Sequence, residues 1–392
     1  MDPVRNPFAP GAGTQPPELA GRADILERGR ITLARAQAGR QGKSFLLVGL
    51  RGVGKTVLLN KIVDQAEEAG SVAHLVETPE NKSLPEVLIP CLRRILFRLD
   101  TAEKVNVAAK RALMVLKAFA GAIRVSVGEV EVGLGIDPER GVADSGDIEA
   151  DLPDLFEAVG TAARSRGRSV VLVVDELQYV AEREFSALIM AMHRVAQKQL
   201  PVVLVGAGLP QLVALAGKSK SYAERLFDFP RIGPLIEVDA ISALRDPAVR
   251  EEADFTADAL ARIIELTEGY PYFLQEWGYH AWNVADDPLI TRDDVERASL
   301  RAIASLDESF FRVRFDRVTP REKDYLFAMS RLGPGPHRSG DVAAALGVAV
   351  ERIAPTRNSL IRKGMIFSPA HGDTAFTVPM FDRYLQRVRA PD

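Results

Sequence analysis

The sequence contains the stretch Gly49-Leu50-Arg51-Gly52-Val53-Gly54-Lys55-Thr56, which follows an apolar run at 45–48 and precedes a helical pattern at 57–63. Glycines let the backbone adopt positive φ and approach a polyphosphate, so that consecutive N–H groups and the N-terminus of the next helix point at the anion. In such a loop the Lys55 ammonium lies between the β- and γ-phosphates, and the Thr56 hydroxyl is a ligand of Mg²⁺. A glycine-rich turn that matches by chance is the alternative, at about one in a hundred. The order strand, loop, helix therefore predicts nucleotide binding.

A second apolar run, Val170-Val171-Leu172-Val173-Val174, ends in Asp175 and Glu176. A continuous β-branched run that ends in carboxylates is typical of a central parallel strand delivering acids to the carboxyl edge of a sheet. In a phosphate-loop protein, Asp175 is predicted to hold Mg²⁺ through water and Glu176 to polarise the attacking water. The alternative is a buried strand whose acids cap the next helix. The position of Asp175 and Glu176 downstream of the glycine loop favours the catalytic interpretation.

Further buried strands are predicted at 72–76, 201–205 and 234–238, with helices at 84–99, 102–119 and 151–166. Five parallel strands with helices between them make a doubly wound α/β sheet. Apolar and polar residues alternate at 123–127 and again at 130–132, with the apolar residues at odd positions in the first segment and at even positions in the second. This pattern predicts a hairpin. We interpret residues 100–140 as an insertion on the core sheet, and its role is open between partner contact and simple decoration.

Composition limits the class of protein. The chain has 392 residues, enough for two or three domains, with ordinary apolar and charged fractions. Cys91 is its single cysteine, which excludes an intramolecular disulfide and predicts a reducing, cytoplasmic location. No signal pattern and no apolar run of membrane-spanning length occurs, so no membrane contact is expected. Residues 306–392 carry 14 Lys and Arg against 10 Asp and Glu, while the rest carries 36 against 43, a weak indication of nucleic-acid contact.

The predicted organisation has four parts. Residues 1–17 are rich in Pro and Gly without periodicity and are expected to form a flexible arm unless a partner holds them. Residues 18–240 are expected to form the nucleotide-binding core, and 241–305 a helical lid broken at Gly269-Tyr270-Pro271. Residues 306–392 form the C-terminal module.

The C-terminal module is predicted to hold three helices, at 320–331, at 339–346 and from Pro355 onward, followed by a hairpin of 365–367 and 375–378. This order resembles a winged helix-turn-helix, in which the third helix reaches base edges of double-stranded DNA. The expected DNA contacts are Thr356, Arg357, Asn358, Arg362 and Lys363, with Arg357 reading a guanine and Asn358 an adenine. The alternative is a module that packs against the nucleotide domain and contacts protein.

With these features placed, residues 18–390 resemble the AAA+ and STAND group of P-loop ATPases, in the branch of replication-initiator, transposition and archaeal-type STAND ATPases. The resemblance rests on the glycine loop, on Asp175-Glu176-Leu177-Gln178 and on Leu19-Ala20-Gly21-Arg22. It implies ATP and Mg²⁺ as ligands, and a role for Arg22 in the adenine pocket. Gly269-Tyr270-Pro271 is similar to the glycine-x-proline motif of STAND proteins, which adds Pro271 to the nucleotide site.

The same resemblance implies an arginine finger at Arg225, which would reach the γ-phosphate of a neighbouring subunit in a nucleotide-dependent homo-oligomer. The alternative is an Arg225 paired with a carboxylate on its own helix, and Arg231 is the other candidate finger. Two departures from the family pattern argue for slow turnover. Residues 206–209 offer no polar side chain to sense the γ-phosphate, and the lid motif lacks an arginine.

The sequence therefore predicts an ATP-binding, slowly hydrolysing switch that couples nucleotide state to DNA binding or assembly. The alternative is a regulatory interaction protein, defence- or toxin-linked, whose winged helix binds protein.

Overall fold

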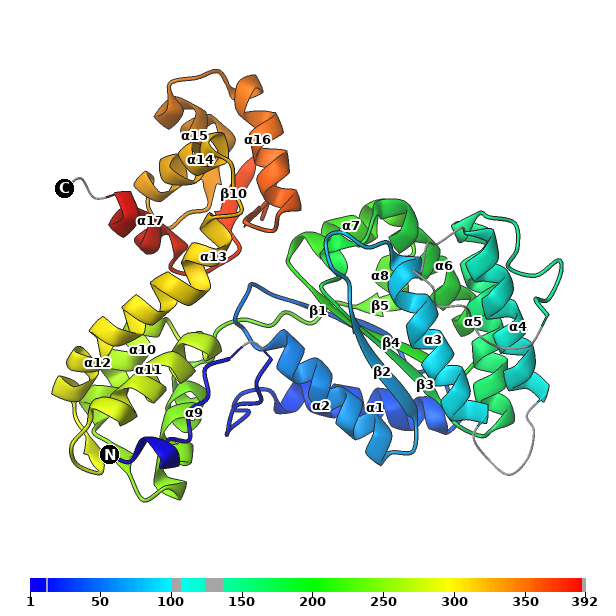
Figure 1. Ribbon diagram of the computed structural model, residues 1–392, viewed down its shortest axis with the longest axis horizontal. Helices are drawn as coiled ribbons and strands as arrows, with labels where there is room; N and C mark the ends of the chain where they lie inside the picture. Colours follow the sequence, from blue (N-terminus) through cyan, green and yellow to red (C-terminus); the bar gives the residue numbers. More distant parts are fainter. Residues whose placement is uncertain (12, 101–106, 124–136, 390–392) are drawn as a thin grey trace. The chain divides into compact units, whose positions relative to one another are not determined.

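A computed structural model describes residues 1–11, 13–100, 107–123 and 137–389. The chain divides into two compact units (Figure 1). The sheet unit comprises Asp24–Val48 and Leu58–Arg231, and the helical unit comprises Met1–Ala23, Gly49–Val57 and Ile232–Asp392. By its contacts, the glycine loop is therefore part of the helical unit, although the strand before it belongs to the sheet unit.

A five-stranded parallel sheet of order β2-β3-β4-β1-β5 forms the centre of the sheet unit. Its strands are β1 (Ser44–Val48), β2 (Val72–Glu77), β3 (Val170–Asp175), β4 (Val202–Gly208) and β5 (Phe227–Asp228). Every residue of β1, β3 and β4 is buried, as expected for interior strands of a parallel sheet that is covered on both faces. The predicted doubly wound α/β class is confirmed.

Helices pack around this sheet (Figure 1). They are α1 (Ala23–Gln37), α2 (Lys55–Glu68), α3 (Leu84–Asp100), α4 (Val107–Ala122), α5 (Ile148–Ser165), α6 (Glu182–Gln197), α7 (Gln211–Ser219) and α8 (Ala223–Leu226), with a short turn of 3-10 helix, η2 (Leu177–Tyr179). In α3, Leu88, Leu92 and Leu96 recur every four residues, so one face of the helix joins the core that β3 and β4 share.

The fifth strand lies earlier in the chain than predicted. β5 pairs with β1, whereas residues 234–238 lead into α9 (Glu237–Arg250). Ile236 and Val238 are 67% and 64% exposed, so the apolar run that suggested a buried strand lies largely at the surface. The prediction of a strand at 234–238 is wrong.

The predicted insertion contributes at least one helix to the core. α4 buries Leu113, Leu116 and Phe119 in the cluster that also contains α3 and α5. The predicted hairpin at 123–127 and 130–132 lies outside the described residues apart from Ile123, as does the predicted start of this helix at 102.

The helical unit contains a bundle with its own apolar core. Its elements are α9, β6 (Asp254–Phe255), α10 (Ala257–Thr267), α11 (Pro271–Val284), β7 (Leu289–Ile290) and α12 (Arg292–Ser305). The predicted break at 269–271 separates α10 from α11. The predicted domain boundary at 240 falls inside α9, whose Ala243 and Leu244 are buried in the bundle core, so this helix belongs with the bundle.

The first residues of the chain pack against this bundle. Phe8 is buried, and a Cβ added at Gly278 of α11 would come within 2.7 Å of its ring. The indole Nε1 of Trp282 donates to the carbonyl oxygen of Asp2 at 2.9 Å. The sequence predicts a mobile arm here because Pro and Gly show no periodicity. The structure differs for residues 1–9, since aromatic side chains of the bundle hold them in place.

The C-terminal module follows a π-helical turn, η3 (Leu306–Phe311), and α13 (Arg312–Phe315). Its helices are α14 (Pro320–Arg331), α15 (Ser339–Leu346), α16 (Val350–Arg362) and α17 (Phe381–Arg389), and its antiparallel sheet has the order β8-β10-β9, formed by His337–Arg338, Asp373–Phe376 and Ile366–Phe367. The first two predicted helices and the hairpin are confirmed, and the side chain of Thr319 caps the N-terminus of α14.

The third helix starts earlier than predicted. α16 begins at Val350, so Pro355 lies inside the helix and does not open it. Proline is most common at the first helical position, which is why the sequence predicts a start at Pro355, but its fixed φ is also compatible with the interior of a helix. The error matters for function, because it moves Arg357 and Asn358 from the first turn to the middle of the helix.

Candidate nucleotide site

The glycine loop joins β1 to α2. Gly52 and Gly54 have φ of 78° and 90°, which side-chain-bearing residues rarely adopt. Gly49 is required by space, since a Cβ there would lie 2.2 Å from the carbonyl oxygen of Ile232. Lys55 is 8% exposed, and its Nζ donates to the carbonyl oxygens of Gly49 at 2.9 Å and Leu50 at 2.8 Å. The ammonium is thus held over the loop at the N-terminus of a helix, where anions bind favourably.

Arg22 lies beside the loop. It is 9% exposed, and its Nη2 donates to the carbonyl oxygens of Val53 at 3.3 Å and Gly233 at 2.5 Å. The guanidinium therefore ties the loop backbone to the chain that leads into α9. In this position the side chain of Arg22 supports the loop by bonding to the main chain of the loop.

The predicted Pro271 site is also next to the loop. Pro271 is the first residue of α11, and the N–H of Tyr272 donates to the carbonyl oxygen of Gly52 at 3.1 Å. Gly269 has φ of 70°, and a Cβ there would lie 2.5 Å from the carbonyl oxygen of Leu235. The break between α10 and α11 thus presents its backbone to the glycine loop.

The loop also contacts the C-terminal module through its main chain. The N–H of Arg51 donates to the carbonyl oxygen of Thr377 at 3.1 Å. Thr377 follows β10 and is fully buried, with its hydroxyl donating to the carbonyl oxygen of Met365 at 3.1 Å. Since the acceptor is a main-chain oxygen, no residue type in the sequence could have signalled this contact.

The acid pair ends β3 in the sheet unit. Asp175 is 4% exposed, and its Oδ1 accepts from the N–H of Glu176 at 2.8 Å. Glu176 has left-handed backbone angles, φ 57° and ψ 34°, a conformation that costs about 1–3 kcal/mol for a residue other than glycine. The hydroxyl of Thr78, directly after β2, donates to the carbonyl oxygens of Asp175 and Glu176 at 2.9 and 2.8 Å. Nothing in the sequence marks Thr78 as part of the site, because a hydroxyl at a strand end has no distinctive pattern.

The sheet places the start of the loop and the acid pair at one edge. β1 and β3 are parallel and separated only by β4, with Val48 opposite Gly208 and Val174 opposite Gly206. Both strands therefore end at the carboxyl edge, where ligands of open α/β sheets bind. The carboxylate of Asp175 is the kind of donor that Mg²⁺ takes alongside water and phosphate. Among the residues that the structure describes, no cluster of three or more His, Cys, Asp or Glu forms a closed metal site.

Arg225 and Arg231 both lie at the surface of the sheet unit. Arg225 is exposed on the short helix α8, and Arg231 pairs through its main chain with Val48. Within the described part of the chain neither side chain forms an ion pair. The alternative in which Arg225 pairs with a carboxylate on its own helix is not what the structure contains.

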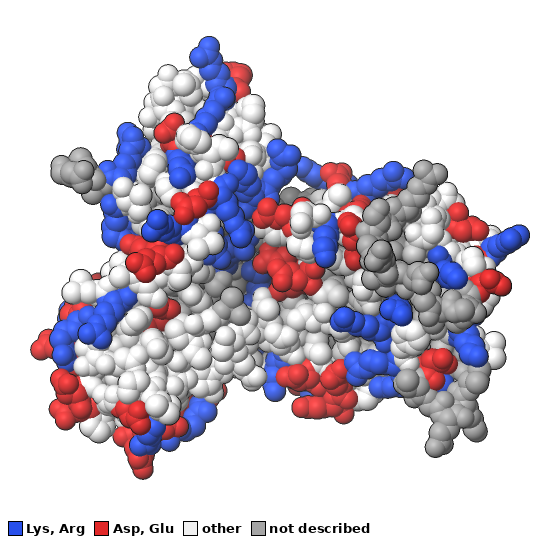
Figure 2. Space-filling view, in the orientation of Figure 1, with Lys and Arg blue, Asp and Glu red and all other residues white. Residues whose placement is uncertain are grey.

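The five predicted DNA contacts differ in their surroundings. Thr356 is buried, and Arg357 donates to the hydroxyls of Thr374 and Ser368 at 3.1 and 2.9 Å. Lys363 donates to Glu322 at 2.7 Å. Asn358 and Arg362 are exposed. Figure 2 shows Lys and Arg interspersed with Asp and Glu over the module, with no single basic stripe on the visible face.

The contacts of Glu322 predict a pH-dependent stability. Burial raises its pKa, but hydrogen bonds from Lys363, Thr319 and Ser359 outweigh that effect and lower the pKa to about 2. The folded state therefore gains stability above the ordinary pKa near 4.3, and loses it as the pH falls toward 2. We expect Glu322→Gln to reduce the loss of unfolding free energy between about pH 6 and pH 3 by about 2 kcal/mol, as measured by urea denaturation. Asp341→Asn, at an exposed acid of α15, is the control, and an equal pH dependence in wild type and Glu322→Gln contradicts the prediction.

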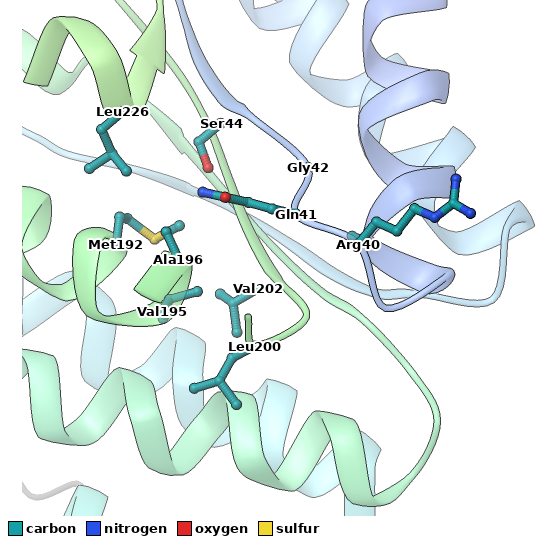
Figure 3. Close-up of a pocket in the computed structure, with 11 residues that line it drawn as sticks. Arg40, Gln41, Gly42, Ser44, Met192, Val195, Ala196, Leu200, Val202 and Leu226 are labelled. Atoms are coloured by element: carbon teal, nitrogen blue, oxygen red, sulfur yellow. The ribbon is translucent and has the colours of Figure 1, made fainter. Parts of the chain in front are cut away.

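A separate pocket opens at the opposite, amino-terminal edge of the sheet. It lies next to Ser44 and Val202, the first residues of β1 and β4 (Figure 3). Ser44 Oγ accepts from the N–H of Leu204 at 2.9 Å, and Figure 3 shows Arg40 pointing away from the other lining side chains. Its lining contains neither the glycine loop nor the acid pair, so this pocket is not the candidate nucleotide site.

Residues 18–205 match the family described as AAA ATPase domain, and residues 308–385 match a domain of unknown function. The chain is similar to the Walker-type ATPase PABY2304 of Pyrococcus abyssi, at 17% identity and a TM-score of 0.59 over 95% of this chain and 97% of that one. It is also similar to the Aeropyrum pernix ORC1 protein in complex with DNA, at 17% identity and a TM-score of 0.48 over 98% and 96% of the two chains. No curated protein matches the chain.

These comparisons agree with the geometry. The likeness to PABY2304 supports the fold, and the sheet unit has the α/β fold of P-loop ATPases. An AAA ATPase domain implies nucleotide binding. The helices of the described residues are too short or too polar to span a bilayer.

Proposed function

We propose that this chain is an AAA+/STAND nucleotide switch that binds Mg·ATP, hydrolyses it slowly and changes its C-terminal contacts with nucleotide state. The observation that carries the proposal is the sheet order, with the loop of Lys55 after β1, the acid pair at the end of β3 and one strand between them. Binding of Mg·ATP that depends on Lys55, and turnover that depends on Glu176, are the tests developed in the Discussion.

In this proposal the N–H groups of the loop and of the first turn of α2 bind the phosphates, and Lys55 neutralises charge between the β- and γ-phosphates. Thr56 and Asp175 hold Mg²⁺, which would screen the phosphate oxygens when bound. Glu176 accepts a hydrogen bond from the attacking water and orients it.

Two features support slow turnover. The chain from 206 to 209 at the end of β4 carries no polar side chain, and α11 opens with Pro271 and Tyr272 where a phosphate-binding arginine would serve. Fewer charged donors aimed at the γ-phosphate leave more of the developing charge unstabilised.

The loop contacts support a switch. Main-chain atoms of Arg51 and Gly52 hydrogen-bond to Thr377 of the C-terminal module and Tyr272 of the bundle. A ligand that rearranges the loop therefore changes the loop's contacts with both the module and the bundle. It shifts the equilibrium between two arrangements of these elements to the extent that it binds one arrangement more tightly than the other.

We interpret the C-terminal module as a winged helix with α16 as its third helix and β9–β10 as its wing, and we favour a protein partner. Three of the five predicted DNA contacts, Thr356, Arg357 and Lys363, are buried or bonded within the module. The first turn of α16 instead exposes Val350 and, just before it, Val348, together with the acidic Glu351. Apolar and acidic groups suit a protein surface better than a phosphate backbone.

DNA is the second candidate partner, favoured by exposed Arg352 and Arg362 on α16. If the module binds protein, we expect its binding to random duplex DNA to be weak. We also expect the salt dependence of that DNA binding to be the same in Arg362→Ala as in the wild-type chain. Fluorescence anisotropy over a series of salt concentrations measures this. A steep salt dependence whose slope falls by about one in Arg362→Ala, but not in the control Arg331→Ala on α14, would establish phosphate contact and favour DNA.

Arg225 is proposed to complete the site of a neighbouring subunit. We expect Arg225→Ala to lower kcat by about 1000-fold at concentrations where the chain oligomerises with ATP, with ATP affinity retained, because the guanidinium stabilises charge that develops on the γ-phosphate. Turnover measured against protein concentration, with light scattering in ATP and in ADP, checks this. Arg231→Ala is the comparison, and an Arg225→Ala variant as fast as wild type at every concentration rules out the finger.

A further inference from the structure

Gln178 connects the acid pair to the end of the neighbouring strand. It lies in η2, two residues after Glu176, and its side chain is partly buried. Its Nε2 donates to Glu176 Oε2, and its Oε1 accepts from the N–H of Leu209 at 3.0 Å. One amide thus bridges the carboxylate after β3 and the backbone after β4.

The two partners fix which way this amide points. A carboxylate only accepts hydrogen bonds, and a backbone N–H only donates. The amide must therefore turn its oxygen to Leu209 and its nitrogen to Glu176, since the flipped orientation would lose both bonds. The Glu176 carboxylate consequently faces a donor whose position is set by β4.

The glycines at the end of β4 provide the space for this arrangement. A Cβ added at Gly206 would lie 2.3 Å from Leu177 Cδ1, and one added at Gly208 would lie 2.9 Å from Gln178 Oε1. Side chains of η2 therefore occupy the volume that a residue at the end of β4 would fill. This explains physically why residues 206–208 are so small, a feature that the sequence showed only as a missing polar group.

The main chain of Glu176 is held independently. Thr78 donates to its carbonyl oxygen at 2.8 Å, and its backbone is left-handed. With its main chain bonded to Thr78 and one carboxylate oxygen bonded to Gln178, the Glu176 side chain has a defined orientation. Fixing a catalytic group by such supporting contacts is how sites reach productive geometry.

We propose that Gln178 is the positioning residue of this site, which aims the Glu176 carboxylate at the attacking water and takes the place of the polar side chain missing from the end of β4. This inference rests on the proposed function, in which Glu176 orients the water.

The test compares Gln178→Met and Gln178→Glu with the wild-type chain. Met keeps the length of the side chain and loses both hydrogen bonds. Glu keeps an acceptor for the N–H of Leu209 but cannot donate to Glu176 when ionised, and it places a second negative charge beside it. We expect both variants to lower kcat by about 10- to 100-fold without weakening ATP binding, because small misplacements of a catalytic group have effects of this size.

The controls separate positioning from folding. Gln197→Glu makes the same change at an exposed site of α6 and should behave as wild type. Melting temperatures identify any variant that fails to fold. In a Glu176→Gln background, Gln178→Met should slow turnover no further, since the two residues act through one carboxylate. A Gln178→Glu variant with wild-type kcat would overturn the proposal, because it would leave Gln178 only the structural bond to Leu209.

Failure of the proposed function is distinguishable. A wild-type chain that hydrolyses no ATP refutes hydrolysis itself, and Gln178 is then judged by hydrogen exchange of its side-chain amide in the nucleotide-free chain. Slow exchange that quickens in Glu176→Ala supports the bridge to the carboxylate, while exchange at the solvent rate in both proteins overturns it.

Discussion

Glu176→Gln is expected to lower kcat for ATP by about 100-fold or more while Mg·ATP still binds, because a neutral amide cannot accept the proton of the attacking water in the transition state. The change preserves the size of the side chain, and its amide oxygen can still accept from Gln178. The left-handed backbone at this position is held by Thr78 through main-chain oxygens, so it does not depend on the carboxylate.

Phosphate release measures turnover, and calorimetric titration with Mg·ATP measures binding. Glu182→Gln, an exposed acid at the start of α6, is the matched control. Loss of binding together with turnover would mean that Glu176 holds the nucleotide and does not act on water. A variant that turns over as fast as wild type would remove Glu176 from the mechanism.

The second large effect is expected for Lys55→Ala, which should weaken Mg·ATP binding by about 100-fold. A hydrogen bond to a charged group contributes about 1.5–3 kcal/mol, and Lys55 reaches two phosphates in the proposed complex. Binding only to the folded state raises its stability by about 2.7 kcal/mol at a ligand concentration of 100 Kd, so wild type should show a clear shift of melting temperature with Mg·ATP and the variant almost none.

The nucleotide-free melting temperature is an essential control, since Lys55 also donates to Gly49 and Leu50 and its removal can loosen the loop. Lys61→Ala changes a lysine further along the same helix, paired with Asp64 at 4.0 Å, and should retain wild-type binding. If Lys55→Ala binds Mg·ATP as wild type does, nucleotide recognition at the loop is disproved.

The central part of the sheet could be predicted from sequence because its signals are local. The buried strands β1 and β3 are continuous apolar runs, and the glycines between β1 and α2 leave few alternatives for the backbone. Asp175 follows from its position at the end of such a run. These predictions depend only on residues that are neighbours in the sequence, so they can be made without knowledge of the tertiary structure.

The fifth strand shows where local pattern is insufficient. Residues 234–238 are as apolar as β2, but a strand also needs a partner, and the free edge of β1 is taken by the two residues Phe227 and Asp228. Pairing at a sheet edge depends on the path of the chain through space. A pattern of five residues does not contain that information.

Side-chain partners were the least predictable feature. Arg357 was expected at a DNA base on account of its residue type, yet it donates to Thr374 and Ser368 beside it in the fold. Gln178 and Thr78 were not recognised as parts of the site, since their partners lie on other strands. The contacts with Thr374, Leu209 and Asp175 join residues 17, 31 and 97 positions apart in the chain, whereas Gln178 and Glu176 are only two residues apart.

The loop's hydrogen bonds to Tyr272 and Thr377 bear on attempts to dissect the protein into fragments. A piece that ends at Arg231 would contain every strand of the parallel sheet, yet it would lack the residues that hold Arg51 and Gly52 in place. Such a truncated protein should fold around its sheet while its loop samples many shapes. Affinities measured on it would then underestimate those of the intact chain, since part of the binding energy would be spent on ordering the loop.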